Sequence, residues 1–481
     1  MALTDAPKKK EPPSPHPLAL LHDPATIRTR CAAIVRSVES GVSAHFAIDR
    51  KRLPAVAERV AALTLRRFPD LKIPFHSRWR HFEAGGVDRK AELDSALAGH
   101  SVAERARAHI DLTVVSVLLD AGAGPTWRYE EHRKLPAAAL PQAAPDELLA
   151  MLDQSASRGR NAAEAPPAAI ETPAGDAAPG GSYTRSEGLG VASFRAFMAG
   201  AFSAKPGEPW RADASALRHV DAAALRAIFQ GGPTNPLVGL EGRAALLSRL
   251  GGVLQGEAAR SGLEPRPGLI YDRLTAGGTR TEVSAQAVLA ELLRCLAPIW
   301  PSGSKVQGLP AGDVWPHRWA GSGVGDGSGM TDRTTDRMND RTTDGWVPFH
   351  KLSQWMTYSL LEPLQWAGVT VTHLDALTGL PEYRNGGLLI DGGVIVPRNP
   401  RLMAHTWKPQ DEFIVEWRAL TVALLDELAV LVRERLGRTA EQLPLTCILE
   451  GGTWAAGREI AAELRTDGSP PLRIDSDGTI F

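Results

Sequence analysis

The sequence is poor in cysteine and has no surplus of either charge. Its 481 residues include three cysteines, and 54 lysines and arginines stand against 55 aspartates and glutamates. Cys31, Cys295 and Cys447 are far apart, form no Cys-x-x-Cys pair and are odd in number, which argues against a disulfide framework. A net charge of −1 leaves no basic surplus for binding a phosphate polymer, so we expect no nucleic-acid partner.

Long apolar runs and a secretory signal are also missing. No stretch approaches the roughly 18 apolar residues that a membrane span needs, so we expect no membrane partner. The first residues, MALTDAPKKKEPPSPHP, contain lysines but lack the apolar run that follows them in a signal peptide. These absences predict a soluble protein of the reducing cytoplasm.

Signature motifs of large enzyme families are absent. The sequence has no Walker loop, no GxGxxG between a strand and a helix, no HExxH and no GxSxG. The thirteen histidines are scattered, and close couples such as His76 and His81 lack a third ligand at metal-site spacing. We therefore expect neither a metal nor an organic cofactor.

Segments of low complexity interrupt the foldable sequence. Residues 1–17 are polar and proline-rich, which predicts a disordered tail, and the segments 135–182 and 321–345 have the composition of insertions. The foldable remainder consists of an N-terminal helical part (18–134), a central helical part (183–320) and a C-terminal helical part with hairpins (346–481).

Helical periodicity dominates these three parts. Asp411 can cap a helix that runs to about Leu436, because Glu412 follows in the first turn and Gly437 lies just beyond the end. Further helices are expected over 53–67, 101–120, 186–203, 240–255, 283–297, 351–366 and 453–465. Apolar runs around Asp-Gly turns predict β-hairpins at 388–396 and 472–481. The predicted fold class is α+β and predominantly α-helical.

Tryptophan outnumbers tyrosine by twelve to five. Large aromatic side chains usually fill the core, but they also form the walls of pockets for ring-like ligands. The segment DVWPHRW (313–319) places Asp313, Trp315 and His317 close together in the chain. It predicts either one wall of such a pocket or a turn around Pro316.

Several carboxylates occur in apolar or glycine-rich surroundings. Asp120 ends the apolar run IDLTVVSVLLD, Glu382 begins PEYRNGG, and Glu416 lies at the edge of an apolar helical stripe. An ion pair or a helix cap is the alternative explanation for each. Carboxylates in water-poor sites are also what hydrolysis of a glycosidic bond requires, because its oxocarbenium-like transition state is positively charged.

Longer strings of the sequence resemble a known family. They include IPFHSRWRHFEAGG (73–86), TRSEGLGVASFRAFMAGAFS (184–203), WVPFHKLSQWMTYSLLEPLQWAG (346–368), TGLPEYRNGGLLIDGGVIVPR (378–398) and EFIVEWRALTVALLDELA (412–429). On these strings the whole chain resembles the uracil-catabolism family that forms the fourth protein of the URC pathway. The resemblance implies a role in a route that converts uracil to its nucleotide, opens the ring and releases urea.

A more distant similarity concerns the order of short motifs. Short motifs follow one another in the same order as in the queuosine salvage proteins. They are the segment SAHFAID (43–49), Asp120 with Trp127, a Gly-Leu-Gly helix, Glu382-Tyr383-Arg384 and Glu416-x-Arg418. Those proteins are helical relatives of DNA glycosylases that cleave the N-glycosidic bond of a nucleoside monophosphate. The similarity implies a DNA-glycosylase-like helical body.

Two departures from that family are evident. The acidic residue before Tyr-Arg is an aspartate there and Glu382 here. The segment that faces the large base there is the glycine-rich AGAGP (121–125) here, which implies a smaller leaving group.

Together the resemblances imply a metal-independent hydrolase of a ring-opened uridine nucleotide, a ureido-ribose phosphate, that releases urea and a ribose phosphate. Glu382 would stabilise the oxocarbenium ion and orient water, and Asp120 would hold ribose hydroxyls or the leaving group. Glu416 is the third catalytic candidate.

The remaining candidates would bind the substrate. Arg384 and Arg418 would bind the phosphate or keep the carboxylates ionised. His45 or His317 would donate a proton to the leaving nitrogen. The other substrate-binding candidates are Trp127, Asp313, Trp315 and Tyr383.

Two alternative functions remain open. One is an amidohydrolase or deaminase acting on the open-chain ureide, which would need a metal or a nucleophile. The other is a non-catalytic partner of the ring-opening enzyme of the same pathway.

Overall fold

The computed structural model describes residues 17–120, 122–124, 126–131, 181–300, 304–321 and 343–475. The expected tail at 1–17 and the two expected insertions lie almost entirely outside these residues. Within them, no helix combines the length and the apolar character that crossing a membrane requires.

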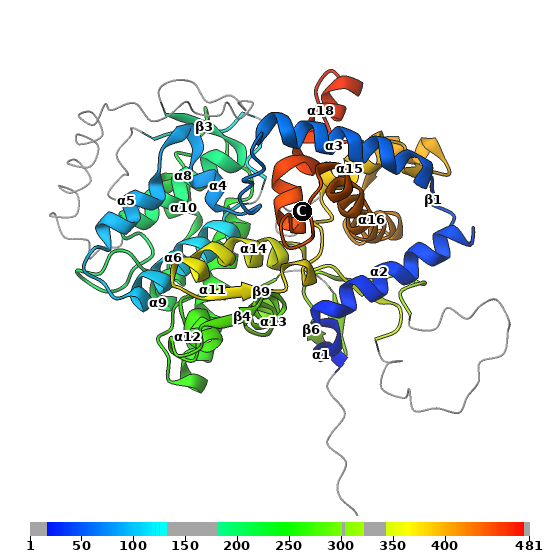
Figure 1. Ribbon diagram of the computed structural model, residues 1–481. Helices are drawn as coiled ribbons and strands as arrows, with labels where there is room; N and C mark the ends of the chain where they lie inside the picture. Colours follow the sequence, from blue (N-terminus) through cyan, green and yellow to red (C-terminus); the bar gives the residue numbers. More distant parts are fainter. Residues whose placement is uncertain are drawn as a thin grey trace, which may run out of the picture.

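Helices build most of the structure (Figure 1). The first are α1 (Pro17–Leu21), α2 (Pro24–Glu39), α3 (Leu53–Arg67), α4 (Trp79–Phe82), α5 (Arg89–Ala96) and α6 (Val102–Leu118). The central ones are α8 (Arg185–Met198), α9 (Ala214–Leu217), α10 (Ala222–Ile228), α11 (Leu240–Ser261), α12 (Leu269–Thr275) and α13 (Ala285–Leu296). The last are α14 (Lys351–Trp366), α15 (Tyr383–Asp391), α16 (Glu412–Leu436), α17 (Leu445–Ile448) and α18 (Trp454–Leu464).

The strands are short and pair two by two. The antiparallel pairs are β1 (Phe46–Ile48) with β10 (Ile395–Pro397), β2 (Arg128–Glu130) with β3 (Ser182–Thr184), β5 (Lys305–Val306) with β6 (Leu309–Pro310) and β7 (Val314–Pro316) with β8 (Trp346–Pro348). The parallel pairs are β4 (Glu282–Ser284) with β9 (Thr370–Thr372) and β11 (Thr406–Trp407) with β12 (Arg473–Ile474). The fold class is therefore confirmed as a predominantly helical α+β fold.

Local signals explain where several helices begin and end. α3 has a proline in its first turn and Arg66 and Arg67 in its last, where they complement the helix dipole. α16 ends at Gly437, whose φ of 61° is the left-handed conformation that a helix C-cap favours. Asp411 stands at the N-cap position of α16, but its carboxylate accepts a hydrogen bond from the Lys408 backbone at 2.7 Å instead of capping the helix.

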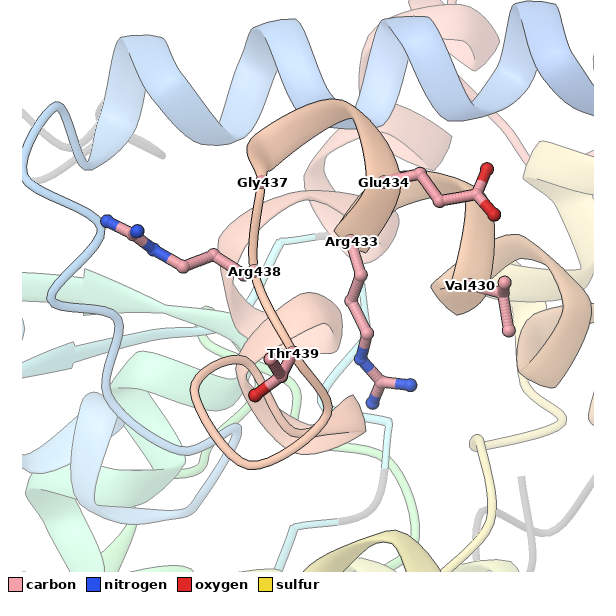
Figure 2. Close-up of a pocket in the computed structure, with 6 residues that line it drawn as sticks. All are labelled: Val430, Arg433, Glu434, Gly437, Arg438 and Thr439. Atoms are coloured by element: carbon pink, nitrogen blue, oxygen red, sulfur yellow. The ribbon is translucent and has the colours of Figure 1, made fainter.

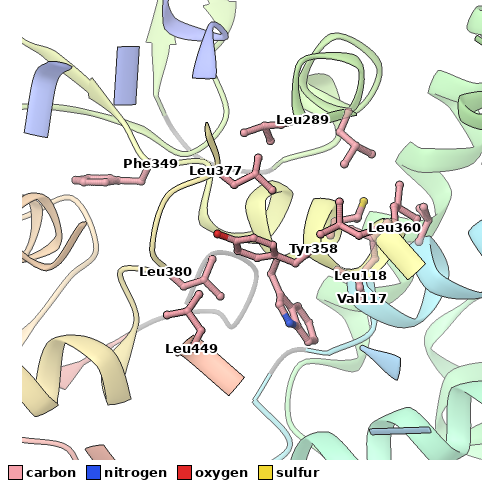
Figure 3. Close-up of a cluster of buried hydrophobic side chains, with 14 of the residues drawn as sticks. Val117, Leu118, Leu289, Phe349, Tyr358, Leu360, Leu377, Leu380 and Leu449 are labelled. Carbon is pink, nitrogen blue, oxygen red and sulfur yellow. The ribbon is translucent and has the colours of Figure 1, made fainter. Parts of the chain in front are cut away.

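One apolar core runs through all three expected parts. Side chains from α6, α13 and α14 and the side chain of Leu449, which follows α17, meet around Tyr358, as Figure 3 shows. The Tyr358 hydroxyl donates a hydrogen bond to the carbonyl of Thr378 at 2.8 Å, so the one polar group of this buried ring is satisfied. In Figure 1, α14 lies between a group of helices with α4, α6 and α8 and a group with α3, α15 and α18.

The hairpin expected at 388–396 is wrong, whereas the one expected at 472–481 extends beyond the described residues. Residues 383–391 form α15, and the chain then continues into β10, which pairs with the distant β1. The Asp-Gly step ends the helix, because Gly392 is its C-cap and Asp391 forms an ion pair with Arg465. At the other site, Arg473–Ile474 pair in parallel with Thr406–Trp407, and residues 476–481 lie outside the described part of the chain.

Candidate functional site

Glu382 stands at the beginning of α15 and is fixed by its own helix. Its carboxylate accepts hydrogen bonds from the backbone N–H groups of Arg384 at 2.8 Å and Asn385 at 2.6 Å. Asn385 is buried and accepts a hydrogen bond from Thr453 at 2.8 Å, which ties this first turn to the beginning of α18. Glu382 itself is partly exposed, and both of its carboxylate oxygens are ordered by the first turn of the helix.

Lys351, the first residue of α14, is affected by the charge of Glu382 and by the charges of other carboxylates that are distant in the chain. Burial lowers the pKa of Lys351, while the negative charges of Glu382, Asp120 and Asp313 act in the opposite direction and Arg418 adds to the lowering. The side chain is partly exposed, and in the described part of the chain its ammonium group has no hydrogen bond or ion pair. A lone lysine at a helix start has no sequence signature, so Lys351 is not among the residues expected from the sequence.

Asp120 follows α6 and lies against a buried arginine. Its Oδ1 atom is 3.2 Å from Nη1 of Arg78, whose side chain is fully buried. Arg78 is held in turn by the Ser116 hydroxyl at 2.7 Å and the Ser186 carbonyl at 3.1 Å. Oδ1 of Asp120 nevertheless accepts no hydrogen bond from the described residues, although it is buried. Such an oxygen is suited to a hydroxyl group of a ligand.

Glu187, in the first turn of α8, is a further carboxylate of this region. Burial raises its pKa, Arg458 and Arg185 lower it, and the negative charge of Asp120 raises it. The charges of Asp120, Arg458 and Arg185 therefore all act on Glu187. Asp120, Glu187, Glu382 and Lys351 together define the candidate site.

Asp313 and Arg418 form a buried pair that positions Lys351. Both terminal nitrogens of Arg418 bind the Asp313 carboxylate at 2.7 Å, so this guanidinium is already engaged by a carboxylate. Oδ2 of Asp313 accepts the backbone N–H of Lys351 at 3.0 Å, and Nε1 of Trp315 donates to Oδ1 at 2.6 Å. The segment 313–319 therefore supports the start of α14.

Glu416 belongs to a different group of contacts. It is buried, accepts a hydrogen bond from the Ser43 hydroxyl at 2.6 Å, and lies 3.5 Å from Nε2 of His317. His45 lies 3.5 Å from Glu412, one turn earlier on α16. These contacts hold the segment before β1 against the first turns of α16. Among the described residues, no hydrogen bond or ion pair joins Glu416, His45 or His317 to Lys351.

Trp127 and Tyr383 differ in their surroundings. Trp127 is fully buried, donates a hydrogen bond to the carbonyl of Phe229 at 2.9 Å, and packs so closely on Gly188 that a β-carbon there would lie 2.8 Å from its ring. Tyr383 is partly exposed beside Glu382, and burial together with that negative charge raises its pKa to about 12.

Two other classes of site find little support. Burial raises the pKa of the thiols of Cys31, Cys295 and Cys447, so none of them is activated as a nucleophile. Among the described residues, no three His, Cys, Asp or Glu side chains are grouped as metal ligands would be.

A shallow hollow occurs at the C-terminal end of α16 (Figure 2). Its lining consists of Val430, Arg433, Glu434, Gly437, Arg438 and Thr439. Arg433 is already bound to Asp375 at 2.6 Å and to the carbonyl of Leu443 at 2.8 Å. None of the candidate residues lines this hollow.

The sequence matches a protein-family model and is similar to two relatives over nearly its whole length. The family model described as "Protein of unknown function (DUF1688)" matches residues 20–139 and 173–481. The chain is 36% identical to Protein urg3 of Schizosaccharomyces pombe over 95% of this chain and 96% of that protein. It is 32% identical to Uracil catabolism protein 4 of Lachancea kluyveri over 97% of this chain and 99% of that protein.

Proposed function

Because the chain belongs to the DUF1688 family, together with the full-length relatives Protein urg3 and Uracil catabolism protein 4, we propose that it is a hydrolase of uracil catabolism. The family membership expected from the sequence is thereby confirmed, and the name of the second relative supplies the pathway. The proposed reaction is hydrolysis of the N-glycosidic bond of a ureido-ribose phosphate, a ring-opened uridine nucleotide. The products are urea and ribose 5-phosphate.

The arrangement of charges around Lys351 is the observation that supports this reaction. Asp120 and Glu382 are distant in the chain, and the negative charges of both act on the ammonium group of Lys351. Cleavage of a glycosidic bond places positive charge on C1 and the ring oxygen of the sugar, and nearby carboxylates lower the energy of that state. The ammonium group of Lys351, on which these carboxylates act, can protonate the leaving group, which is the other requirement of the reaction.

Each residue has a defined task in the proposed step. Glu382 accepts a proton from water while the water oxygen bonds to C1, and the C1–N bond breaks with its electron pair going to nitrogen. Lys351 donates the proton that makes the leaving nitrogen part of neutral urea. Asp120, whose Oδ1 is paired with Arg78 without a well-aligned hydrogen bond, accepts a hydrogen bond from a ribose hydroxyl.

The buried arginines beside Asp120 support the same assignment. Arg78 lies 3.2 Å from the carboxylate, and Arg243 donates a hydrogen bond to the carbonyl of the preceding Leu119 at 2.9 Å. Both guanidinium groups are held by other contacts, so Asp120 keeps one orientation. Because the carboxylate of Asp120 is already held in place, it needs little reorganisation when positive charge develops on the sugar.

The identity of the products tests the proposal. Full-length protein is incubated with a ureido-ribose 5-phosphate that carries ¹³C in its carbonyl and ¹⁵N in both nitrogens, and the mixture is followed by NMR. We expect urea that retains the carbon and both nitrogens, together with ribose 5-phosphate. Labelled ammonia with the second nitrogen still on ribose would instead indicate an amidohydrolase. No turnover of this compound would exclude the proposed reaction.

A further inference from the structure

One terminal nitrogen of Arg78 has no hydrogen-bond partner. Arg78 is fully buried, and its Nε donates a hydrogen bond to the Ser116 hydroxyl at 2.7 Å. Nη1 donates to the Ser186 carbonyl at 3.1 Å and lies 3.2 Å from Oδ1 of Asp120. Nη2 is also buried, yet no described residue accepts a hydrogen bond from it. Unsatisfied N–H groups in the interior are unfavourable, so this nitrogen is suited to an acceptor atom of a ligand.

The indole of Trp355 is a second donor of this kind. Trp355 is 7% exposed, and its Nε1 atom is buried without a hydrogen-bond acceptor among the described residues. Buried indole N–H groups usually find a partner, as Nε1 of Trp79 does at the Ser359 carbonyl, 3.1 Å away. Trp355 follows Lys351 by four residues on α14, so both side chains lie on the same face of the helix.

The two unpartnered donors belong to one group of contacts. The guanidinium carbon of Arg78 lies 5.8 Å from the centre of the Trp355 ring. Two hydrogen bonds of about 2.9 Å that end on one oxygen atom bridge a separation of this size. His81 completes the group, because its ring centre lies 5.9 Å from that of Trp355 and its Nδ1 lies 3.3 Å from Nη1 of Arg78. His81 is partly exposed, so the group reaches the surface at this residue.

The charges of the group favour a neutral ligand with a carbonyl oxygen. An anion such as phosphate would be attracted by Arg78 but repelled by the Asp120 carboxylate, which lies 3.2 Å from that arginine. A cation would be repelled by Arg78, and the indole of Trp355 offers it no acceptor. A carbonyl oxygen has two lone pairs, so it can accept from both unpartnered donors at once. The ureido group is the part of the proposed substrate that carries such an oxygen.

We propose that Nη2 of Arg78 and Nε1 of Trp355 bind the carbonyl oxygen of the leaving ureido group. The inference deepens the proposed function and rests on it for the identity of the substrate. When the C1–N bond breaks, its electron pair goes to nitrogen, and conjugation shares that negative charge with the carbonyl oxygen. Fixed donors at this oxygen therefore stabilise the transition state more than the ground state. Lys351, on the same face of α14 as Trp355, supplies the proton to the nitrogen.

NMR of the Trp355 indole tests this subsite without requiring turnover. Full-length protein carries ¹⁵N in its tryptophan indoles, and the Trp355 signal is the one that is missing from Trp355→Phe. The ligand is a carbocyclic analogue of the ureido-ribose 5-phosphate, in which CH2 replaces the ring oxygen so that no oxocarbenium ion forms. The reference compound has hydrogen in place of the ureido group. We expect the ureido analogue to shift the Trp355 N–H proton downfield, as a new hydrogen bond does, and the reference compound to leave it unchanged.

Calorimetry with the same two compounds measures what the indole donor contributes. Trp355→Phe keeps an aromatic ring and removes the N–H group, so it should weaken binding of the ureido analogue roughly threefold to tenfold, the usual effect of losing a neutral hydrogen bond. Its affinity for the reference compound should be unchanged. Trp366→Phe is the matched control, because Trp366 is the last residue of α14 and packs on Trp79, with 4.6 Å between the ring centres. This variant should bind both compounds like the wild type.

The outcomes separate the subsite from the hydrolase. The proposal is overturned if the ureido analogue does not bind, if it leaves the Trp355 signal unchanged, or if Trp355→Phe binds it as tightly as the wild type does. A Trp355 signal that responds to the analogue in a protein that does not cleave the ureido-ribose phosphate would refute the hydrolase and retain the subsite. Release of urea by a protein whose Trp355 signal stays unchanged would do the reverse.

Discussion

Gly457 of α18 lies directly against the backbone of Arg384 in α15, with no room for a β-carbon between them. This contact joins the element that carries Glu382 to the element that carries Arg458. The position of Glu382 in the candidate site therefore depends on the packing of α15 against α18, and both helices are distant in sequence from Asp120.

Replacement of Gly457 by alanine should damage both stability and activity. The extra methyl group would push α18 from α15, and overpacking of this kind typically costs about 1–3 kcal/mol. Chemical denaturation should report that loss, and turnover of the ureido-ribose phosphate should fall because Glu382 is displaced. Gly252→Ala is the control, because Gly252 lies in α11 with open space around it. That change should be neutral or stabilising by about 0.5–1 kcal/mol, and a similar loss in both variants would contradict the packing argument.

The activity should decrease at alkaline pH because of Lys351. Burial lowers the pKa of this group, and Glu382, Asp120, Asp313 and Arg418 are the charges that face it. The protonated form is the proposed acid, so kcat/KM should fall as the pH rises through a value below the ordinary lysine pKa of about 10.4. Lys351→Met should reduce kcat about a hundredfold or more and remove this pH dependence. An active variant with an unchanged pH profile would assign the acid to another group.

Asp313→Asn should act mainly on stability. Burial raises the pKa of Asp313, but Arg418 and the hydrogen bonds from Lys351 and Trp315 lower it more, so the net shift is downward. The stability that comes from this depressed pKa is present above the pKa of the unfolded state and is lost as the pH falls through the folded value. Breaking a buried pair of this kind typically costs about 3–5 kcal/mol. Urea denaturation at neutral and acidic pH should show that the difference between variant and wild type shrinks in acid.

Glu416→Gln separates a supporting role from a catalytic one. Its carboxylate binds Ser43 and faces His317, and we expect a stability loss of about 1–3 kcal/mol with little change in kcat per folded molecule. Thermal unfolding and turnover are measured on the same preparation. A variant of wild-type stability that has lost turnover would restore Glu416 as a catalytic candidate.

Local patterns in the sequence were sufficient to predict most of the long helices, although α2 and α15 were not among them. The ranges 53–67 and 351–366 correspond to α3 and α14, because apolar periodicity and start signals are encoded within each segment. The hairpin predicted at 388–396 failed because the same Asp-Gly chemistry also ends a helix. What decides between the two is non-local: Gly386 packs on the Trp417 ring, and Asp391 pairs with Arg465.

The candidate site was only partly predictable for the same reason. Asp120 and Glu382 stand out in the sequence because a charge is unusual in apolar or glycine-rich surroundings. Arg78 and Lys351 carry no such signal, and their importance depends on contacts with Asp120 and Asp313 that only the folded chain creates. His45, His317 and Glu416 have equally suggestive residue types, but their contacts lie around the start of α16.

Turnover by Glu382→Gln is the most direct test of the central claim that carboxylates around Lys351 perform the hydrolysis. The amide can still accept one of the two backbone hydrogen bonds, so the fold should persist. Asp221→Asn is the matched control, since Asp221 caps α10 by the same kind of hydrogen bond, to Ala224 at 2.8 Å. We predict that Glu382→Gln lowers kcat by a factor of about 100 or more on the ureido-ribose phosphate, while Asp221→Asn is as active as the wild type. A folded Glu382→Gln protein with wild-type turnover would contradict the account.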